Sequence, residues 1–452
     1  MNTTPKSLVA LVAVFGLLAC GSHEKPPANP VSDKATSSKG FDESTIETNP
    51  NKNLYWGDLH VHTSLSFDAY LSGTLANPDD AYKYATGNTL NIFGRDIKLR
   101  EPLDFCAVTD HSELMGESYS ISTEGAKGHN SLVGMFIRSI YKTDSPLGVD
   151  TAKQWKIFNM VMDKAEEPSR SHPAFFYGYE TTMAAWDITL AAAEKYYEPG
   201  KFTTLAGFEF TLMTGRAHLH RNIIFRDLKV PNYPISSIEA ENEQDLWQWM
   251  QEAQNNGATL MSIPHNTNLS EGHAFDGKDR EGNPITKEYA EMRANFERLV
   301  EVHQAKGNSE VHAAFWKNDE FADFENHTFG ESNKANYVRH GLKKGLEMQR
   351  ELGVNPYKLG MIGSTDTHNA TPGNTEEDDI QIGNNGIIDI DPLNRSFDKW
   401  PLDITQKTIE VINPGGLVAV WAGANTRGHI FDALQNREVY ATSGNRIQLR
   451  FF

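Results

Sequence analysis

Residues 55–68 read Tyr55-Trp56-Gly57-Asp58-Leu59-His60-Val61-His62-Thr63-Ser64-Leu65-Ser66-Phe67-Asp68. The rest of the chain is organised around this stretch. Leu59 and Val61 alternate with His60 and His62, as residues on the two faces of a β-strand do. Two imidazoles at this spacing share one face and can hold one metal ion. The polar residues after them predict a loop, which delivers Asp68 a few residues later.

Histidines and carboxylates recur together after later apolar runs of the chain, at Asp110-His111, Glu209, His265 and Asp366-Thr367-His368. His220 differs, because it stands just before the short strand-like run 222–225, and His218 competes with it for the same role. One His-x-His pair is weak support for a metal site, since such pairs also arise by chance at strand edges. The recurrence at strand ends indicates that these side chains meet in one site.

The composition predicts a folded chain that does not coat nucleic acid. Its 452 residues are enough for two or three average domains, or for one large α/β barrel. The hydrophobic fraction of 39% supports a sizeable core, and the net charge of -18 argues against binding to nucleic acid. Part of the acidity is expected in metal ligands, whose charge a bound cation neutralises.

The first 20 residues predict a processing segment. Lys6 precedes the apolar run 8–19, which is too short to span a bilayer comfortably. Leu17-Leu18-Ala19-Cys20 resembles a bacterial lipobox, so we expect residues 1–20 to be a lipoprotein signal peptide and Cys20 to carry the lipid. The alternative is an ordinary secretory signal with a chance cysteine. The first interpretation places the mature protein in the bacterial cell envelope, anchored by lipid to the outer membrane and facing the periplasm.

Residues 21–53 are rich in Pro, Ser, Lys, Asp and Asn, which predicts a flexible linker. Over residues 54–452 strand-like and helix-like runs alternate, which predicts one catalytic domain of parallel β/α architecture. Polar side chains after strands are typical of a barrel, whose active face lies at the carboxyl ends of its strands. The less regular run 112–175 predicts an insertion, and the run 446–452 predicts a last strand. Cys106 lies in an apolar run and is expected in the core.

Nine side chains form the candidate metal site, and all of them offer nitrogen or oxygen: His60, His62, Asp68, His111, Glu209, His220, His265, Asp366 and His368. These donors suit zinc, manganese or iron, and a carboxylate such as Glu209 can bridge two ions. Two or three divalent ions would supply a metal-activated hydroxide by lowering the pKa of water from about 15.7 to about 7. The candidates for proton transfer are Asp110 and His368. The candidates for substrate contacts are Arg221, Asn266 and Lys306, with plain surface charge as the alternative for the two cations.

These motifs resemble the PHP superfamily, named after polymerase and histidinol phosphatase. Longer strings at residues 55–60, 220–222, 264–266, 306–310 and 440–444 resemble a bacterial branch of it, the family known as domain of unknown function 3604. The resemblance covers roughly residues 53–452. It implies a distorted seven-stranded (β/α)7 TIM-like barrel with insertions, a metal site at the C-terminal ends of its strands, and phosphoesterase activity.

The resemblance also implies how the ligands divide among the ions. His60, His62, Glu209 and Asp366 would hold one ion. Glu209, His220 and His265 would hold a second, and Asp68, His111 and His368 a third. Asp68 stands where many relatives have histidine, so the expected number of ions is two or three.

We therefore predict a metal-dependent hydrolase, most specifically a phosphoric ester hydrolase that acts on a small-molecule phosphate ester. One alternative is an amidohydrolase-like enzyme that cleaves C–N bonds or lactones, because His-x-His on a first barrel strand also opens that family. Such enzymes usually have a carboxylated lysine on a middle strand, where this chain has Glu209. The other alternative is a metal-stabilised surface lipoprotein that binds a ligand without catalysis.

Overall fold

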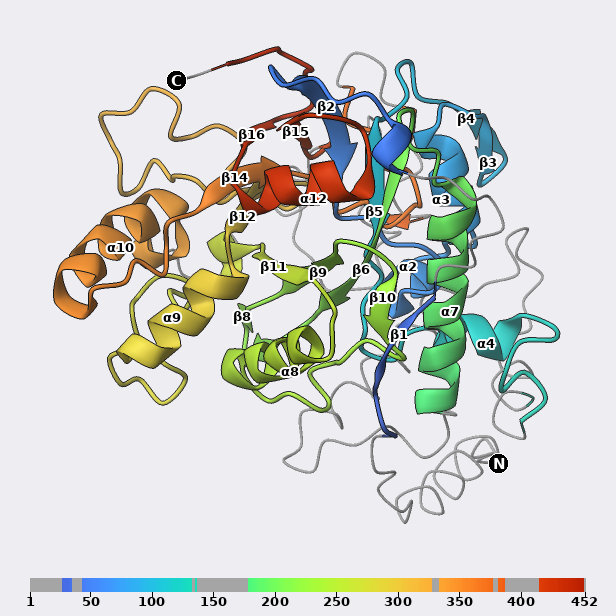
Figure 1. The fold of residues 1–452 in the computed structure, drawn as a ribbon, viewed down its shortest axis with the longest axis horizontal. Helices are drawn as coiled ribbons and strands as arrows, with labels where there is room; N and C mark the ends of the chain where they lie inside the picture. Colours follow the sequence, from blue (N-terminus) through green and yellow to red (C-terminus); the bar gives the residue numbers. More distant parts are fainter. Residues whose placement is uncertain are drawn as a thin grey trace, which may run out of the picture.

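The computed structural model describes residues 27–34, 43–131, 135, 178–326, 333–376, 381–386 and 414–450 (Figure 1). The predicted signal peptide at residues 1–20 lies outside these ranges, and so does most of the insertion predicted at 112–175. The described residues form a mixed α/β fold. None of their helices combines the length and the apolar character that crossing a bilayer requires.

The central element is a seven-stranded sheet that is curled into a half-barrel. In spatial order its strands are β11 (Leu260–Pro264), β9 (Arg221–Phe225), β6 (Thr203–Phe210), β5 (Phe105–Val108), β2 (Asn53–Asp58), β15 (Leu417–Ala422) and β16 (Val439–Thr442). A second sheet consists of β13 (Gly307–Asn308), β12 (Leu299–Gln304) and β14 (Gly360–Gly363). β14 lies beside β16 and β12 lies beside β11, so the second sheet stands between the two edges of the first. The result is a barrel-like α/β fold.

The central strands are buried on both faces, which explains their nearly continuous apolar sequences. In β5, Phe105 and Ala107 belong to a core inside the curl, whereas Cys106 and Val108 belong to a second core outside it. The inner core draws on both sheets and on the helix α12 (Arg427–Gln435). Cys106 is fully buried, as expected.

Helices surround the two sheets (Figure 1). They are α2 (Phe67–Leu71), α3 (Pro78–Ala85), α4 (Glu117–Ser122), α7 (Tyr179–Tyr196), α8 (Glu243–Asn255), α9 (Lys287–Phe296) and α10 (Val338–Leu352), with the 3₁₀ turns η1 (Glu43–Thr45), η2 (Thr267–Leu269) and η3 (Lys334–Asn336). α8 begins where the Asn242 side chain accepts a hydrogen bond from the Asp245 amide. α10 ends at Gly353, whose φ of 79° is the left-handed conformation that glycine adopts readily.

The expectation of a uniformly parallel sheet is wrong at two strands. β9 runs antiparallel to β6 and β11, and β15 runs antiparallel to β2 and β16. Only residues 211–220 connect β6 to β9, and they form the hairpin of β7 (Met213–Thr214) and β8 (Ala217–His218). A parallel return needs about a dozen residues or more, usually a helix. β9 therefore starts at the sheet edge where β6 ends, and it brings His220 there ahead of its first residue.

The predicted flexible linker at 21–53 is docked on the domain where the structure describes it. β1 (Val31–Asp33) pairs antiparallel with β10 (Lys229–Pro231). The Asn29 side chain donates to the carbonyl of Tyr233 at 2.9 Å and accepts from its amide at 3.0 Å. Strand pairing of this kind relies on main-chain hydrogen bonds, so a polar sequence can dock without a large apolar face.

The C-terminal residues differ from the strand predicted at 446–452. Residues 443–450 follow β16 without joining a sheet, and residues 451–452 lie outside the described ranges. Side chains attach this segment instead. The Tyr440 hydroxyl donates to the Ile447 carbonyl at 2.6 Å, and the Trp421 indole donates to the Leu449 carbonyl at 3.0 Å. The remaining described strands, β3 (Leu90–Ile92) and β4 (Arg95–Ile97), form a separate hairpin.

Candidate metal centre

One edge of the curled sheet brings the candidate ligands together. β2, β5, β6, β11 and β14 end near this edge, and β9 begins there because it runs in the opposite direction. The candidate ligands lie on these strand ends and on α2: His60, His62, Asp68, His111, Glu209, His220, His265, Asp366 and His368. All of them are buried except Asp68, which is partly buried. His220 precedes β9, as its place before the run 222–225 predicted, and Asp68 lies on α2.

The carboxylate of Glu209 lies in the middle of this cluster. Its Oε1 lies 2.8 Å from Nδ1 of His220 and 3.0 Å from Nε2 of His265. Its Oε2 lies 3.1 Å from Nε2 of His62, 3.3 Å from Nε2 of His60 and 3.3 Å from Nδ1 of His111. Each oxygen therefore faces its own set of imidazoles, which is the geometry of a carboxylate that can bridge two ions.

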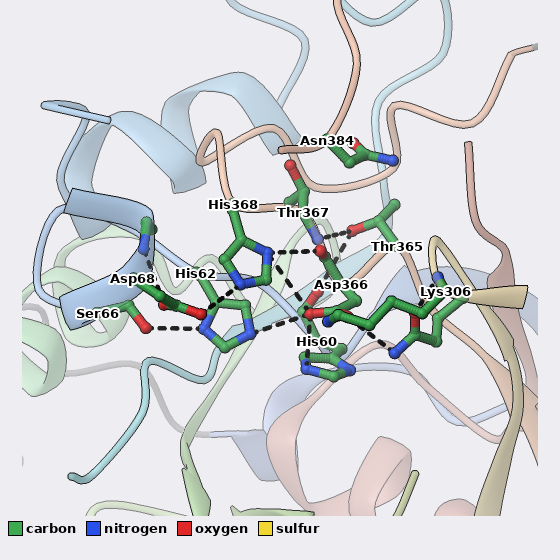
Figure 2. A network of polar contacts seen from close by, with 12 residues as sticks. His60, His62, Ser66, Asp68, Lys306, Thr365, Asp366, Thr367, His368 and Asn384 are labelled. Carbon is green, nitrogen blue, oxygen red and sulfur yellow. Dashed lines mark hydrogen bonds and ion pairs between the residues drawn. The ribbon is translucent and has the colours of Figure 1, made fainter. Parts of the chain in front are cut away.

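Asp366 completes the group of ligand atoms around Glu209 Oε2 (Figure 2). Its Oδ1 lies 3.2 Å from Nε2 of His60 and 3.2 Å from Nε2 of His62. Among the described residues, Asp366 Oδ1 and His62 Nε2 are buried without a hydrogen-bond partner. Four ligand atoms about 2.0–2.1 Å from a tetrahedral ion are about 3.3–3.4 Å apart, close to the spacing here. The orphaned atoms therefore fit a divalent ion.

A further group of ligand atoms forms around Asp68, beside His62 (Figure 2). Asp68 Oδ2 lies 3.1 Å from Nε2 of His111 and 2.9 Å from Nε2 of His368. Among the described residues, four groups of side chains place ligand atoms close enough to hold an ion: His62, Asp68, His111 and His368; His60, His62 and Glu209; His60, His265 and Glu301; and Glu209, His220 and His265. Three of these groups overlap with the division of ligands that the resemblance implies, and the remaining one contains Glu301.

The second ring nitrogen of several histidines is also engaged, which fixes the orientation of the ring. His62 Nδ1 lies 2.9 Å from the Ser66 hydroxyl, and His368 Nδ1 lies 3.0 Å from the main-chain oxygen of Asp366. His111 Nδ1 contacts the Thr211 hydroxyl. These contacts leave Nε2 of each ring turned toward the carboxylates.

The electrostatics of the cluster favour the metal-binding protonation state at His265 and Asp366, whereas neighbouring carboxylates outweigh burial at His60 and His111 and raise the pKa of both imidazoles. Burial and the neighbouring His60 lower the pKa of His265 to about 3. Burial would raise the pKa of Asp366, but Lys306 and His60 hold it well below its usual range. Near neutral pH the Asp366 carboxylate is therefore ionised and the His265 imidazole neutral, the states that metal ligands need.

Asp110 lies beside the cluster but has a different environment. Its two carboxylate oxygens accept hydrogen bonds from the amide and the hydroxyl of Thr63, at 2.5 and 2.7 Å. Burial raises the pKa of Asp110 to about 7. Its contacts hold the loop after His62 in place, whereas His368, the other candidate for proton transfer, lies in the cluster itself.

The three candidate substrate residues have different surroundings. Arg221 is buried away from the cluster, and its Nε lies 2.7 Å from Glu297 Oε1, because neighbouring residues on a strand point to opposite faces. Asn266 is buried and accepts a hydrogen bond from Gln304. Lys306 contacts Asp366 Oδ2 and keeps 29% of its side chain exposed. The expectation for Arg221 is wrong, and Lys306 is the cation at the rim of the cluster.

The sequence analysis overlooked two residues of β12. Both oxygens of Glu301 lie 3.1 Å from His60 Nδ1, and Gln304 Nε2 donates to Asp366 Oδ2 at 2.8 Å. Gln304 thereby helps to hold Asp366, whose φ of 54° is unusual for a residue other than glycine. A signal for Glu301 was present, since a carboxylate inside the apolar run 299–303 is rarely buried without a partner.

Two further histidines lie near the cluster without joining it. His218, the rival of His220, stacks on the His220 ring at a centroid distance of 4.8 Å. His303 Nε2 lies 2.7 Å from Glu325 Oε2, and His303 belongs to none of the ligand groups that the described residues form. His220 is therefore the histidine of its hairpin that reaches Glu209.

Comparisons with known proteins give one extensive match. The family model described as "Protein of unknown function (DUF3604)" matches residues 49–452. No curated protein matches the chain. A similar solved structure is a two-domain protein from Bacteroides vulgatus that contains a predicted PHP-like metal-dependent phosphoesterase. It is 12% identical, with a TM-score of 0.35, and the match covers 93% of this chain and 69% of that protein.

Proposed function

The chain belongs to the DUF3604 family, and from this premise we propose that it is a metal-dependent hydrolase, most specifically a phosphoesterase. One observation carries the proposal. The two oxygens of the buried Glu209 carboxylate face two separate sets of imidazoles, with His220 and His265 on one side and His60, His62 and His111 on the other. A structural ion pair does not require one carboxylate to be shared between two sets of imidazoles.

The donor set fits two or three divalent ions of zinc, manganese or iron, since it offers imidazole nitrogen and carboxylate oxygen only. Bound there, such ions would supply Lewis acidity and a water whose pKa falls from about 15.7 to about 7. Glu209, His60, His62 and Asp366 would hold one ion. Glu209, His220 and His265 would hold a second, and Asp68, His111 and His368 a third.

Lys306 favours an anionic substrate. Its ammonium group reaches the cluster from the β12–β13 loop, contacts Asp366 and remains partly exposed. Two divalent ions would carry more positive charge than the carboxylates Asp68, Glu209 and Asp366 carry negative charge. Lys306 adds to this excess of positive charge. An excess of positive charge in a buried site attracts the oxygens of a phosphate ester and stabilises the charge that develops on them.

His368 is the residue that we assign to proton transfer. It lies 2.9 Å from Asp68, the one candidate ligand that is partly exposed. When two ions fill the places beside Glu209, His368 paired with Asp68 would be free to take part in proton transfer to a leaving oxygen. Asp110 is a weaker candidate for this step, because Thr63 occupies both of its oxygens.

Two further proposals concern the fold and the location of the protein. The two sheets are proposed to form a distorted seven-stranded barrel of the PHP type, which the positions of β12 and β14 beside the edges of the curled sheet support. The lipobox-like residues 17–20 support lipidation of Cys20 and a periplasmic location at the outer membrane. Cys20→Ser is expected to release the protein from the membrane fraction, and an unchanged distribution would contradict the anchor.

The proposed activity is tested by elemental analysis of the purified protein, followed by screening of phosphomonoesters, phosphodiesters, amides and lactones. We expect stoichiometric metal and turnover of phosphate esters, which His60→Ala abolishes. The exposed His273 provides the matched control, and His273→Ala should keep full activity. Turnover of amides or lactones alone would indicate a C–N or lactone hydrolase. Metal without any turnover would indicate a binding protein.

A further inference from the structure

β12 passes behind the candidate metal centre and contributes none of the expected ligands. In the middle of this strand stands Glu301, which is 1% exposed. Its two oxygens each lie 3.1 Å from His60 Nδ1, while His60 Nε2 lies 3.3 Å from Glu209 and 3.2 Å from Asp366. The His60 ring is therefore held between a carboxylate behind it and two carboxylates in front.

This arrangement determines which nitrogen of His60 carries its proton. An ionised carboxylate can only accept a hydrogen bond, so Nδ1 of His60 donates to Glu301. With an ion held between Nε2 and the oxygens of Glu209 and Asp366, Nε2 would direct its lone pair at that ion, and Nδ1 would keep the one proton of the neutral ring. The negative charge of Glu301 also makes this lone pair more electron-rich, and burial strengthens that influence because the dielectric constant is low.

Glu301 differs from the other groups that hold the ligand histidines. His62 is held by a hydroxyl group, that of Ser66, and His368 by a main-chain carbonyl. Glu301 is a carboxylate outside the expected ligand set, and it meets the second ring nitrogen of a ligand histidine. It can therefore tune the affinity of the centre as well as orient a ring.

An alternative role for Glu301 is direct metal binding, since His60, His265 and Glu301 also offer ligand atoms within 4.8 Å of one another. That arrangement is unfavourable, because both rings already direct Nε2 at Glu209. Each imidazole would then have to lose both ring protons and bridge two ions. A hydrogen bond from His60 to Glu301 requires no such change.

We propose that Glu301 is a positioning residue, which fixes His60 as an Nε2 ligand and raises the affinity of the centre for its ions. The inference rests on the proposed metal-dependent function. It predicts that the negative charge of Glu301 matters, beyond the shape of its side chain. Second-layer carboxylates of this kind typically change metal affinity by about 10–100-fold.

The test compares Glu301→Gln, Glu301→Ala and the wild type. Metal affinity is measured by competition with a chelator, metal content by elemental analysis, and ligand geometry by the absorption spectrum of the cobalt-substituted protein. Glu301→Gln keeps the size of the side chain, so it remains informative should Glu301→Ala fail to fold. The matched control is Glu297→Gln, which alters an equally buried glutamate that lies just before β12 and pairs with Arg221 and Arg293.

We expect Glu301→Gln to bind the same number of ions as the wild type. The affinity for the ion that is affected most should fall by about 10–100-fold, and the cobalt spectrum should shift. Glu297→Gln should lower thermal stability and leave metal affinity unchanged. Unchanged affinity in Glu301→Gln would overturn the inference while the proposed function stands. Loss of one whole ion would overturn it as well, because Glu301 would then be a ligand. Absence of metal from the wild type would overturn both.

Discussion

His220 and Arg221 are neighbours in the chain, yet they belong to two different buried clusters of charged groups. Arg221 pairs with Glu297 at 2.7 Å, and Arg293 pairs with the other oxygen of Glu297 at 2.8 Å. His220 instead reaches Glu209, whose other neighbours are further imidazoles. The Arg221 cluster is neutralised by its own guanidinium groups. The Glu209 cluster collects carboxylates and imidazoles and has Lys306 as its cation.

The difference indicates how a structural ion pair can be told from an ion-binding site. In the Arg221 cluster each carboxylate oxygen of Glu297 meets a guanidinium group. In the Glu209 cluster the carboxylate oxygens meet imidazoles instead, as Asp366 Oδ1 meets His62 Nε2 at 3.2 Å, and an imidazole is neutral in the state that binds metal. Burial of polar atoms in this state is costly unless a cation joins them. Substitutions in the Glu209 cluster should therefore change activity and metal content, whereas substitutions in the Arg221 cluster should change stability.

The largest effect is expected from Glu209→Gln, which removes the shared carboxylate but keeps the size of the side chain. We expect kcat/KM for the best phosphate ester to fall by about 10⁴-fold, together with a loss of bound metal. Glu297→Gln is the matched variant in the other cluster, and its kcat/KM should stay within about tenfold of the wild type. Steady-state kinetics and elemental analysis measure both. Near-normal activity of Glu209→Gln would remove the distinction between the clusters.

Metal removal should destabilise the protein through the Glu209 cluster alone. Ions present at 1,000 times their dissociation constant stabilise the folded state by about 4 kcal/mol. Thermal unfolding with and without a chelator measures this contribution. The shift in Tm should shrink in Asp366→Asn and persist in Glu297→Gln. An equal shift in both variants would mean that the chelator acts elsewhere.

Arg221→Ala should act on stability. It leaves the Glu297 carboxylate with only Arg293 as a close cationic partner, and breaking a buried pair of this kind costs about 3 kcal/mol. Urea unfolding measures the loss, and elemental analysis of the folded fraction should show unchanged metal content. Loss of activity at full stability would instead support the substrate contact that the sequence predicted for Arg221.

Glu117 provides a third environment, in which a buried carboxylate has no guanidinium or imidazole partner among the described residues. Burial raises its pKa well above 4.5, while a hydrogen bond from Gly178 lowers it slightly. A raised pKa means that this group's stabilising contribution is present below pH 4.5 and is lost as the pH rises through the folded-state value. Glu117→Gln should therefore stabilise the protein by about 1 kcal/mol at pH 8, with less effect at pH 4.

Melting temperatures across this pH range test the prediction. The exposed Glu124 supplies a control, because Glu124→Gln should change stability little at either pH. A gain for Glu117→Gln that does not grow with pH would show that its charge is not the cause.

The sequence was sufficient to predict which side chains meet, since most of the candidate ligands directly follow an apolar strand and such ends gather at one edge. It was not sufficient to predict strand direction, which depends on the short connection at residues 211–220. The error for Arg221 has the same origin. Successive residues of a strand point to opposite faces of the sheet. Only the pairing of β9 with β6 and β11 assigns His220 to one cluster and Arg221 to the other.

Glu301 and the docked linker were overlooked for a different reason. Each depends on a partner that is distant in sequence, His60 for Glu301 and β10 for Val31–Asp33. Local patterns contain no information about such partners. A charged residue within an apolar strand does signal that a partner exists, and it could have identified Glu301 as a residue to explain.

The hairpin between β6 and β9 has a consequence for how the pocket assembles during folding. Glu209 and His220 meet across a short loop, so their contact costs little chain entropy and can form as soon as this hairpin folds. His60 and Asp366 meet only when a loop of roughly 300 residues closes. One half of the pocket is thus ready early, and the other half is completed only when distant parts of the polypeptide arrive.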